Sequence, residues 1–393
     1  MLRIGQFTDT FLPVADGVGR VVVAYAETLS SKGQQVTVSS PLYDTGFRGG
    51  YPYELVDYRG RDVFFSKQYK TGLTVFDRHY RERMKMIPLD LVHSHSPFIA
   101  GREALRIARQ RGIPMVSTFH SKYYDDFLKV THSKAFARLG TRAIVGFYNH
   151  CDEVWACGDS TAGVLAGYGY CGRIVVMPNG VTLREPEPAA LAEAARQYHI
   201  DAEIPALLFV GQMNWKKNIM TILSACVLLR EEGFPFRLIL AGQGPDRDGI
   251  LEKIHELGLD AQVTMAGHIT DNALLDALYA LSSLFVFPSL YDNAPMVIRE
   301  AAVMKTPSVM VEGSSGSEVI RDGINGYLSK NDADSLAGVI RKALSSRVTL
   351  QQVGERAFET IPVPWDVLMD RVIERYTLLV EKSRRGELKR KPV

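Results

Sequence analysis

Short apolar segments alternate with segments of helical periodicity along most of this chain, and this alternation restricts the possible folds more than any other feature. It is typical of parallel β-sheets built from β-α-β units. The alternation occurs in two runs, which are separated by a polar stretch containing Ala and Pro at residues 181–205. We predict strands at residues 2–9, 35–41, 62–67, 89–96, 114–121, 153–158 and 173–180 in the first run, and at 206–212, 236–242, 262–268, 284–289, 308–314 and 326–330 in the second.

The length of the chain indicates more than one domain. At 393 residues it exceeds what a single hydrophobic core usually organises. We therefore predict an α/β fold with two tandem doubly wound, Rossmann-like domains. The expected boundaries are residues 1–182 for the first domain, 183–204 for a linker, 205–363 for the second domain and 364–393 for a C-terminal helix that crosses back to the first domain.

Composition disfavours several classes of function. The formal net charge of +2 gives no strong attraction to nucleic acid. The N-terminus opens directly into a strand pattern without the features of a signal peptide, and no apolar run approaches the ~18 residues of a membrane span. We expect a cytoplasmic protein. The cysteines show no CxxC spacing, which favours reduced structural thiols over a zinc site or a disulfide framework: Cys151, Cys157, Cys171 and Cys226.

A glycine pair in the first run precedes a predicted helix. In open parallel sheets ligands bind beyond the carboxyl ends of the strands, and Gly17 and Gly19 lie in such a loop, where their amide groups could face an anion. A plain loop into a helix explains them equally well. The third glycine and the acidic residue of a dinucleotide fingerprint are missing, which disfavours a nicotinamide-dependent dehydrogenase.

Two loops of the second run carry lysines or glycines. Lys216 and Lys217 stand just before a helix, where a lysine can reach a phosphate as a point charge, although adjacent lysines are more often solvated. Gly242 and Gly244 permit a close backbone approach, although by themselves they indicate only a turn.

The stretch FPSLYDNAPMVIREAA at 287–302 is the most informative. It leads from an apolar strand into a turn with Asp292, and then into a helix that begins near Pro295 and bears Glu300. Unpaired amides at a helix start suit a diphosphate, whereas carboxylates repel phosphate but accept hydrogen bonds from hydroxyl groups. The combination indicates a ligand with both phosphates and sugars, which is a sugar nucleotide.

Taken together, these motifs resemble those of the retaining glycosyltransferases of family 4, which have the two-domain GT-B fold. The likeness extends over nearly the whole chain and rests on GVG at 17–19, the spacing from Gly211 to Lys217, AGQGP at 241–245, and 287–302 followed by KTPSVMVEGSSGSEVI at 305–320. The resemblance implies that Lys217 contacts the donor diphosphate, Glu300 binds ribose hydroxyls and Asp292 binds hydroxyls of the transferred sugar. The implied donor-binding residues are Gly17, Gly19, Gln212, Lys217, Gly242, Gly244, Asn293, Ala294, Pro295, Met296, Val297 and Glu300.

The sequence departs from the family pattern at two positions. Asp292 stands where the family usually has a glutamate, so the carboxylate reaches less far by one methylene and the identity of the donor sugar stays open. Gln212 stands where an arginine is common, so Lys217, with or without Lys216, has to supply most of the positive charge.

On the acceptor side, the resemblance implies a role for His120, through its imidazole or its backbone carbonyl. We assign His120, Lys217 and Asp292 as the catalytic set, with His95 and Asp16 as further acceptor-side candidates, and we interpret His93 as structural. The resemblance also implies a front-face reaction in which the leaving phosphate takes the acceptor proton. We expect no metal ion and no cofactor, the donor being a substrate, most simply a uridine diphosphate sugar.

The resemblance implies a hydroxyl group as the acceptor, and it favours the hydroxyl of a lipid such as diacylglycerol. Residues 68–87 and 125–149 are basic and amphipathic, which is typical of peripheral binding to an anionic membrane, although ordinary core-facing helices explain them as well. Three alternatives remain open: a soluble or polysaccharide acceptor, a sugar-nucleotide epimerase or hydrolase, and a non-catalytic sugar-nucleotide sensor. The oligomeric state is not determined by the sequence.

Overall fold

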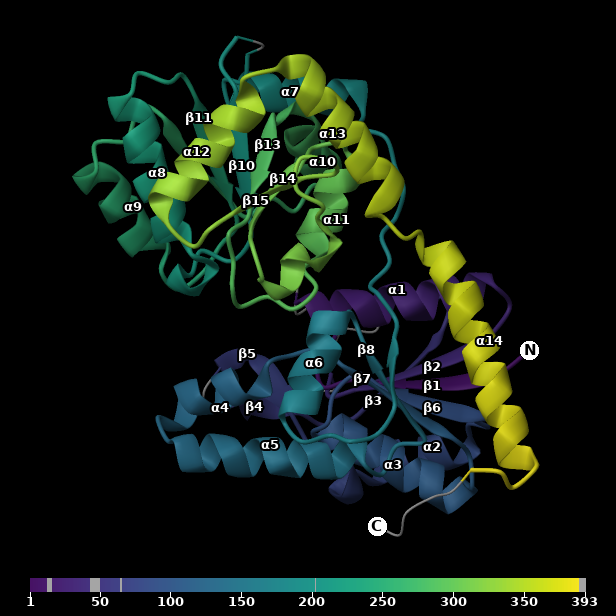
Figure 1. Ribbon diagram of the computed structural model, residues 1–393. Coiled ribbons are helices and arrows are strands. Elements are labelled where there is room, and N and C mark those ends of the chain that lie inside the picture. Colours follow the sequence, from purple (N-terminus) through teal and green to yellow (C-terminus); the bar gives the residue numbers. More distant parts are fainter. Residues whose placement is uncertain (13–15, 43–49, 64–65, 202, 389–393) are drawn as a thin grey trace. The chain divides into compact units, whose positions relative to one another are not determined.

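The computed structural model describes residues 1–12, 16–42, 50–63, 66–201 and 203–388 (Figure 1). The chain divides into two compact units: unit 1 contains Met1–Gly180 together with Val363–Val393, and unit 2 contains Val181–Pro362. Each unit is a parallel sheet with helices on both faces, so the predicted α/β class with two doubly wound sheets is confirmed.

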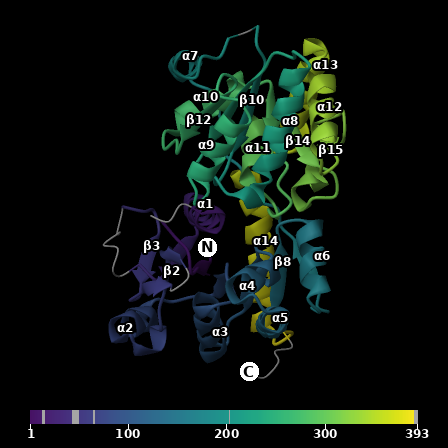
Figure 2. The same cartoon turned by 90° about the vertical axis from the view of Figure 1, so that its left-hand side faces the viewer.

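Unit 1 is built on a parallel sheet with the strand order β3-β2-β1-β6-β7-β8-β9. Helix α1 lies on one side of this sheet, and α2 and α3 lie on the other (Figure 2). The strands are β1 (Arg3–Phe7), β2 (Gln35–Ser40), β3 (Glu54–Asp57), β6 (Leu91–Ser94), β7 (Met115–Phe119), β8 (Glu153–Ala156) and β9 (Ile174–Val176). The helices are α1 (Gly17–Ser31), α2 (Arg78–Met86), α3 (Ile99–Arg111), α4 (Tyr123–Thr131), α5 (Lys134–Tyr148), α6 (Asp159–Gly167) and α14 (Trp365–Arg384).

The strand predicted at residues 62–67 is wrong as a member of this sheet. Residues 64 and 65 lie outside the described part of the chain, and their neighbours form a separate antiparallel pair, β4 (Arg61–Val63) and β5 (Ser66–Thr71). The edge position is taken instead by β3, whose Leu55 pairs with Val38 of β2. The four residues of β3, ELVD, are too short and too polar at their ends to form a recognisable apolar run.

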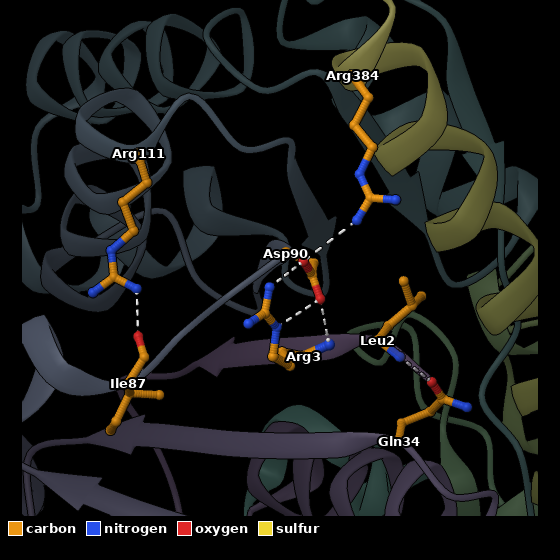
Figure 3. A network of polar contacts seen from close by, with 7 residues as sticks. All are labelled: Leu2, Arg3, Gln34, Ile87, Asp90, Arg111 and Arg384. Carbon is orange, nitrogen blue, oxygen red and sulfur yellow. Dashed lines mark hydrogen bonds and ion pairs between the residues drawn. The ribbon is translucent and has the colours of Figure 1, made fainter.

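A polar network fixes the amino ends of β1 and β6 (Figure 3). The backbone amide of Arg3 and its guanidinium both donate to Asp90, with N–O distances of 2.8–3.0 Å, and Arg384 of α14 adds a 3.7 Å ion pair. The hydrogen bonds and charge of Arg3 lower the pKa of the Asp90 carboxyl. Because this network lies at the edge opposite the strand ends where ligands bind, it holds the scaffold together and takes no part in the candidate site.

Unit 2 is built on a second parallel sheet, with the order β12-β11-β10-β13-β14-β15. Helices α8, α9 and α12 lie on one side of it, and α10, α11 and α13 lie on the other (Figure 1). The strands are β10 (Ala206–Val210), β11 (Arg237–Ala241), β12 (Val263–Gly267), β13 (Leu284–Val286), β14 (Ser308–Val311) and β15 (Tyr327–Ser329). The helices are α7 (Pro188–Gln197), α8 (Ile219–Glu231), α9 (Arg247–Glu256), α10 (Asn272–Leu281), α11 (Met296–Val303), α12 (Ala333–Leu344) and α13 (Arg347–Thr360).

The chain order reverses at one place in each sheet. In unit 1 the reversal lies between β1 and β6, and in unit 2 it lies between β10 and β13, because β1 and β10 each pair with the next strand on one side and with a later strand on the other. The strand cores there are fully buried apolar residues such as Leu208 and Phe285. At such a reversal the flanking loops diverge, leaving a crevice beyond the carboxyl ends in which ligands bind.

Candidate functional site

The loops that follow β10 and β13 meet at the strand reversal of unit 2. The ammonium of Lys217 lies 2.5 Å from Oδ1 of Asp292, and the hydroxyl of Ser289 donates to Oδ2 of the same carboxylate at 2.5 Å. The side chains of Lys217 and Asp292 remain 13% and 22% exposed. Two residues singled out in separate loops are therefore brought together as an ion pair that is partly open to solvent.

Asn218 holds the lysine loop in place. It follows the short 3-10 helix Trp215–Lys217 and has a left-handed backbone with φ of 63°, which is uncommon for any residue but glycine. Its side-chain amide donates to the carbonyl of Pro288 at 3.1 Å and to Asn331 at 2.8 Å. Asn218 thus ties the loop carrying Lys217 to the loop carrying Asp292. Sequence reasoning missed this residue, although its place directly after the lysine pair was a usable signal.

The second lysine of the pair packs on an aromatic ring. The ammonium of Lys216 lies 4.5 Å from the centroid of Tyr291, and that of Lys217 lies 5.7 Å from it. Both distances are within the range of cation–π attraction. Gln212, which stands where an arginine was expected, is exposed and brings no charge.

Glu300 lies in helix α11, about one turn from its start at Met296. The hydroxyl of Tyr279 donates to its Oε2 at 3.3 Å, and Tyr279 is fully buried. Nearby, Arg184 donates to both oxygens of the buried Asp276, and the pKa of Arg184 is raised by those hydrogen bonds and further by the charges of Asp276 and Glu300. Arg184, which falls inside the expected linker, is anchored in unit 2 and adds a positive charge near Glu300.

Helix α11 begins at Met296 with Pro295 as its N-cap residue, and no side chain caps it. The backbone amides at its start are therefore available to an acceptor outside the helix. Asn293 is buried in the preceding turn, and Ala294, Pro295, Met296 and Val297 are each partly exposed.

Gly242 and Gly244 have a structural reason that the sequence did not reveal. Gly242 has φ of 141°, and a Cβ there would stand 1.8 Å from the carbonyl oxygen of Gly211. A Cβ on Gly244 would stand 2.3 Å from the carbonyl oxygen of Met213. The close approach is made between the loops after β10 and β11, so these glycines set the path of the lysine loop.

The glycine loop of unit 1 is capped from within the chain. Asp16 is the N-cap of α1, and its Oδ1 accepts from the amide of Gly19 at 2.6 Å. Burial raises the pKa of the Asp16 carboxyl. A Cβ on Gly17 would meet nothing within 4 Å among the described residues. The carboxylate thus occupies the position expected for a phosphate at Gly19, and a ligand anion would have to replace it.

A chain of hydrogen bonds crosses the carboxyl ends of β8, β7, β6 and β1 in unit 1. His120 accepts from the thiol of Cys157 at 3.4 Å and lies 3.2 Å from His95, which in turn lies 2.7 Å from Oε1 of Gln6. The chain continues from Gln6 to Tyr376 of α14 at 3.4 Å, from Tyr376 to His93 at 2.5 Å and from His93 to Thr118 at 2.7 Å. With Gln6 Oε1 accepting, every link is satisfied when each imidazole carries its proton on Nε2.

Burial keeps these imidazoles neutral. The pKa values of His93 and His95 are lowered well below the ordinary value, chiefly by loss of hydration and further by neighbouring histidines. Burial lowers the pKa of His120 to about 4.

The candidate histidines differ in their access to a ligand. His93 and His95 are fully buried, so His95 lies behind His120 rather than at the surface of the unit. His120 is partly exposed at the end of β7. Its two ring nitrogens bond Cys157 and His95, which leaves its backbone as the part best placed to meet a ligand. Gln6 and Tyr376 gave no sequence signal, because Tyr376 stands 283 positions from His93.

The described residues contain neither a metal-binding cluster nor a membrane-spanning helix. In 1–12, 16–42, 50–63, 66–201 and 203–388, no group of three or more His, Cys, Asp or Glu side chains is placed to hold a metal ion. Over the same part of the chain, no helix has both the length and the apolar character needed to cross a bilayer.

Both halves of the chain match models of known families. Residues 183–360 match the model described as "Glycosyl transferases group 1", and residues 15–185 match "Glycosyltransferase Family 4". Together the two matches cover every strand of the second sheet and every strand of the first sheet except β1.

Curated relatives match over most of the chain. The alpha-monoglucosyldiacylglycerol synthase of Streptococcus pneumoniae is 24% identical over 368 residues, covering 91% of this chain and 82% of the relative. The protein of the same name from Acholeplasma laidlawii is 24% identical over 348 residues, covering 84% and 86%. Among solved structures, Anabaena HepE in complex with UDP and glucose superposes with a TM-score of 0.75 at 16% identity, covering 96% of this chain and 100% of that one.

Proposed function

Because the chain is a glycosyltransferase with the two-domain GT-B fold, we propose that it transfers a hexosyl group from a uridine diphosphate sugar to a hydroxyl acceptor with retention of configuration. The acceptor in this proposal is a membrane lipid such as diacylglycerol. The observation that carries it is the meeting of Lys217 and Asp292 at the strand reversal of unit 2.

The residues of unit 2 suit the parts of a sugar nucleotide. Lys217 supplies a positive charge for the leaving diphosphate, and the uncapped start of α11 supplies amide donors. Glu300 and Asp292 supply carboxylate oxygens for hydroxyl groups. The structure of HepE with UDP and glucose supports this choice of ligand for the shared fold.

In unit 1, His120 is assigned to the acceptor side. Its pKa of about 4 makes the imidazole neutral at physiological pH, and its ring nitrogens are engaged by Cys157 and His95. We therefore assign it a positioning contribution through its backbone, and leave the acceptor proton to the departing phosphate. In this scheme the chain contributes orientation and charge stabilisation of the leaving group.

Two observations support a lipid acceptor. Two curated relatives carry the name alpha-monoglucosyldiacylglycerol synthase. In addition, α5 exposes Phe136 and Leu139 at 64% and 62%, beside exposed Arg138 and Arg142. No acidic residue occurs between positions 127 and 151. A face that is both basic and apolar fits an anionic bilayer surface.

Residues 68–87, the other basic segment, fit the alternative explanation of a helix that faces the core. Asp77 caps α2, so Phe76 precedes the helix that carries Tyr80 and Met84. Tyr80 and Met84 are buried in the core, and Phe76 lies outside the helix with 82% exposure. The peripheral-membrane proposal is therefore confined to α4 and α5.

A nucleotide-release screen tests the transferase proposal. The purified protein is incubated with UDP-glucose and other sugar nucleotides, with and without diacylglycerol in mixed vesicles, phosphosugars and oligosaccharides. We expect UDP release that depends on diacylglycerol, and an α-linked product by NMR. Equal release without any acceptor would indicate a hydrolase or epimerase instead. Lys217→Ala should lower turnover at least ~100-fold, whereas Lys216→Ala, its exposed neighbour, is the matched control with a much smaller effect.

Vesicle sedimentation tests the membrane surface separately. We expect the protein to sediment with vesicles containing phosphatidylglycerol at low salt, and Phe136→Ser with Leu139→Ser to weaken this binding about tenfold. Val348→Ser is the matched control, because Val348 is 68% exposed but belongs to unit 2. Equal binding by both variants, or no binding by the unaltered protein, would remove α5 as the membrane surface.

A further inference from the structure

The ion pair of unit 2 joins two groups that the proposed donor would use separately. Lys217 is assigned to the diphosphate and Asp292 to the sugar, yet the two side chains bind each other at 2.5 Å. Ser289 holds the second oxygen of Asp292, and the amide of Tyr291 donates to the Ser289 hydroxyl at 3.3 Å, so the carboxylate is kept beside the lysine. A diphosphate approaching Lys217 therefore meets a carboxylate already in place.

Nearby positive charge is limited on this side of the loop. Gln212 is neutral, and Lys216 lies over the ring of Tyr291. A phosphate oxygen that binds the ammonium of Lys217 comes to lie next to the Asp292 carboxylate. The two negative charges, both close to the same ammonium, repel each other. The repulsion is relieved if the carboxylate turns from the lysine to neutral donors, and the hydroxyls of a hexose are such donors.

We propose that the Lys217–Asp292 pair is an exchange element that distinguishes the sugar nucleotide from the nucleoside diphosphate left after transfer. With the complete donor, the diphosphate takes Lys217 and the sugar hydroxyls take Asp292. After transfer the sugar hydroxyls are gone, and Asp292 returns to Lys217. The binding of the remaining nucleoside diphosphate is thereby weakened. The inference rests on the proposed function, since it assigns the diphosphate and the sugar to these two residues.

A permanent ion pair would behave in the opposite way. If Asp292 served only to orient Lys217 toward phosphate, removing its charge would disorder the lysine and weaken the binding of a nucleoside diphosphate. If the two groups exchange, the Asp292 carboxylate competes with the diphosphate for Lys217. Removing its charge then removes the competitor and strengthens the binding of a nucleoside diphosphate. The sign of the change therefore separates the two arrangements.

The test is calorimetric titration of UDP and of UDP-glucose into the full-length protein and into Asp292→Asn, which keeps the shape of the side chain and removes its charge. We expect the variant to bind UDP about fivefold more tightly, a scale set by the loss of one partly exposed ion pair. We also expect the preference for UDP-glucose over UDP to shrink. Asp292→Glu, which keeps the charge, should bind UDP as the unaltered protein does, and it guards against a general effect of substitution on folding.

The outcomes distinguish this inference from the function on which it rests. If the unaltered protein binds neither UDP nor UDP-glucose, the proposed donor fails, and the exchange fails with it. If it binds both, but Asp292→Asn binds UDP equally or more weakly, only the exchange is overturned. Tighter UDP binding by Asp292→Glu as well would trace the effect to the substitution itself and would also overturn it.

Discussion

Acidification is expected to destabilise unit 1, because its buried histidines are held neutral. A histidine whose pKa is lowered by folding takes up a proton more readily in the unfolded chain. Its contribution to stability is therefore complete above the unfolded pKa of about 6.5 and is lost as the pH falls toward the folded pKa. For His120 the folded pKa is about 4, so the window runs from about pH 6.5 down to that value.

The size of the effect follows from proton linkage. Between pH 7 and pH 5, His120 alone should cost unit 1 about 2 kcal/mol of unfolding free energy. Burial lowers the pKa values of His93 and His95 in the same direction, so their protonation should add to this loss. Asp9 and Asp16 act in the other direction, because burial raises their pKa values and their protonation favours the folded state.

Urea unfolding at a series of pH values measures this loss. Of the three tryptophans, Trp155 and Trp365 belong to unit 1 and Trp215 belongs to unit 2, so fluorescence in a Trp215→Phe background reports on unit 1. In that background, His120→Gln should reduce the loss between pH 7 and pH 5 by about 2 kcal/mol, because one titrating group is removed. A midpoint that stays constant from pH 7 to pH 5, or a loss unchanged in His120→Gln, would refute the reasoning.

Three further pairs of substitutions test other features. Asn218→Ala should destabilise unit 2 by about 2 kcal/mol, whereas Asn218→Gly keeps the left-handed backbone and should lose about 1 kcal/mol less; equal losses in urea unfolding would show that backbone strain is unimportant there. Gly242→Ala should abolish folding of unit 2, measured by circular dichroism, because its Cβ would lie 1.8 Å from a carbonyl oxygen. As the control, Gly249→Ala in helix α9 should be neutral or stabilising. Normal melting of Gly242→Ala would contradict the close packing. Tyr376→Phe should lower the unfolding free energy of unit 1 by about 1–3 kcal/mol, because His93 loses its hydrogen-bond donor. Tyr58→Phe should cost little, because the hydroxyl of Tyr58 has no hydrogen-bond partner among the described residues. Similar losses in both variants would remove the hydrogen-bond chain as the cause.

The sequence was sufficient to place Lys217 and Asp292 near each other, because both follow strands of one parallel sheet and the carboxyl ends of such strands share an edge. It was not sufficient to show that they bind each other, because that depends on the rotamers of two flexible side chains and on Ser289. Gly242 illustrates the same limit. Its turn was predicted, but the contact that requires a glycine is with Gly211, in a different loop.

Contacts between distant segments were the least accessible from the sequence. Tyr376 reaches His93 only because α14 packs in unit 1, and no periodicity within either segment signals that contact. The edge strand β3 was not predicted from the sequence, for a different reason. It makes regular parallel pairs with β2, but four residues with a charge at each end carry too little apolar pattern to be separated from a loop.

The two units carry charge in different ways, and this difference bears on the kind of acceptor. In unit 2 the candidate residues are ionic and partly exposed, which suits a ligand with a diphosphate. In unit 1 the candidate histidines are neutral, and Asp16 is engaged in capping α1. Neutral, internally bonded groups give little stabilisation to a charged acceptor but place no penalty on an uncharged hydroxyl. We therefore expect diacylglycerol to exceed phosphosugars as an acceptor in the release screen, and a preference for phosphosugars would require a cationic acceptor site elsewhere.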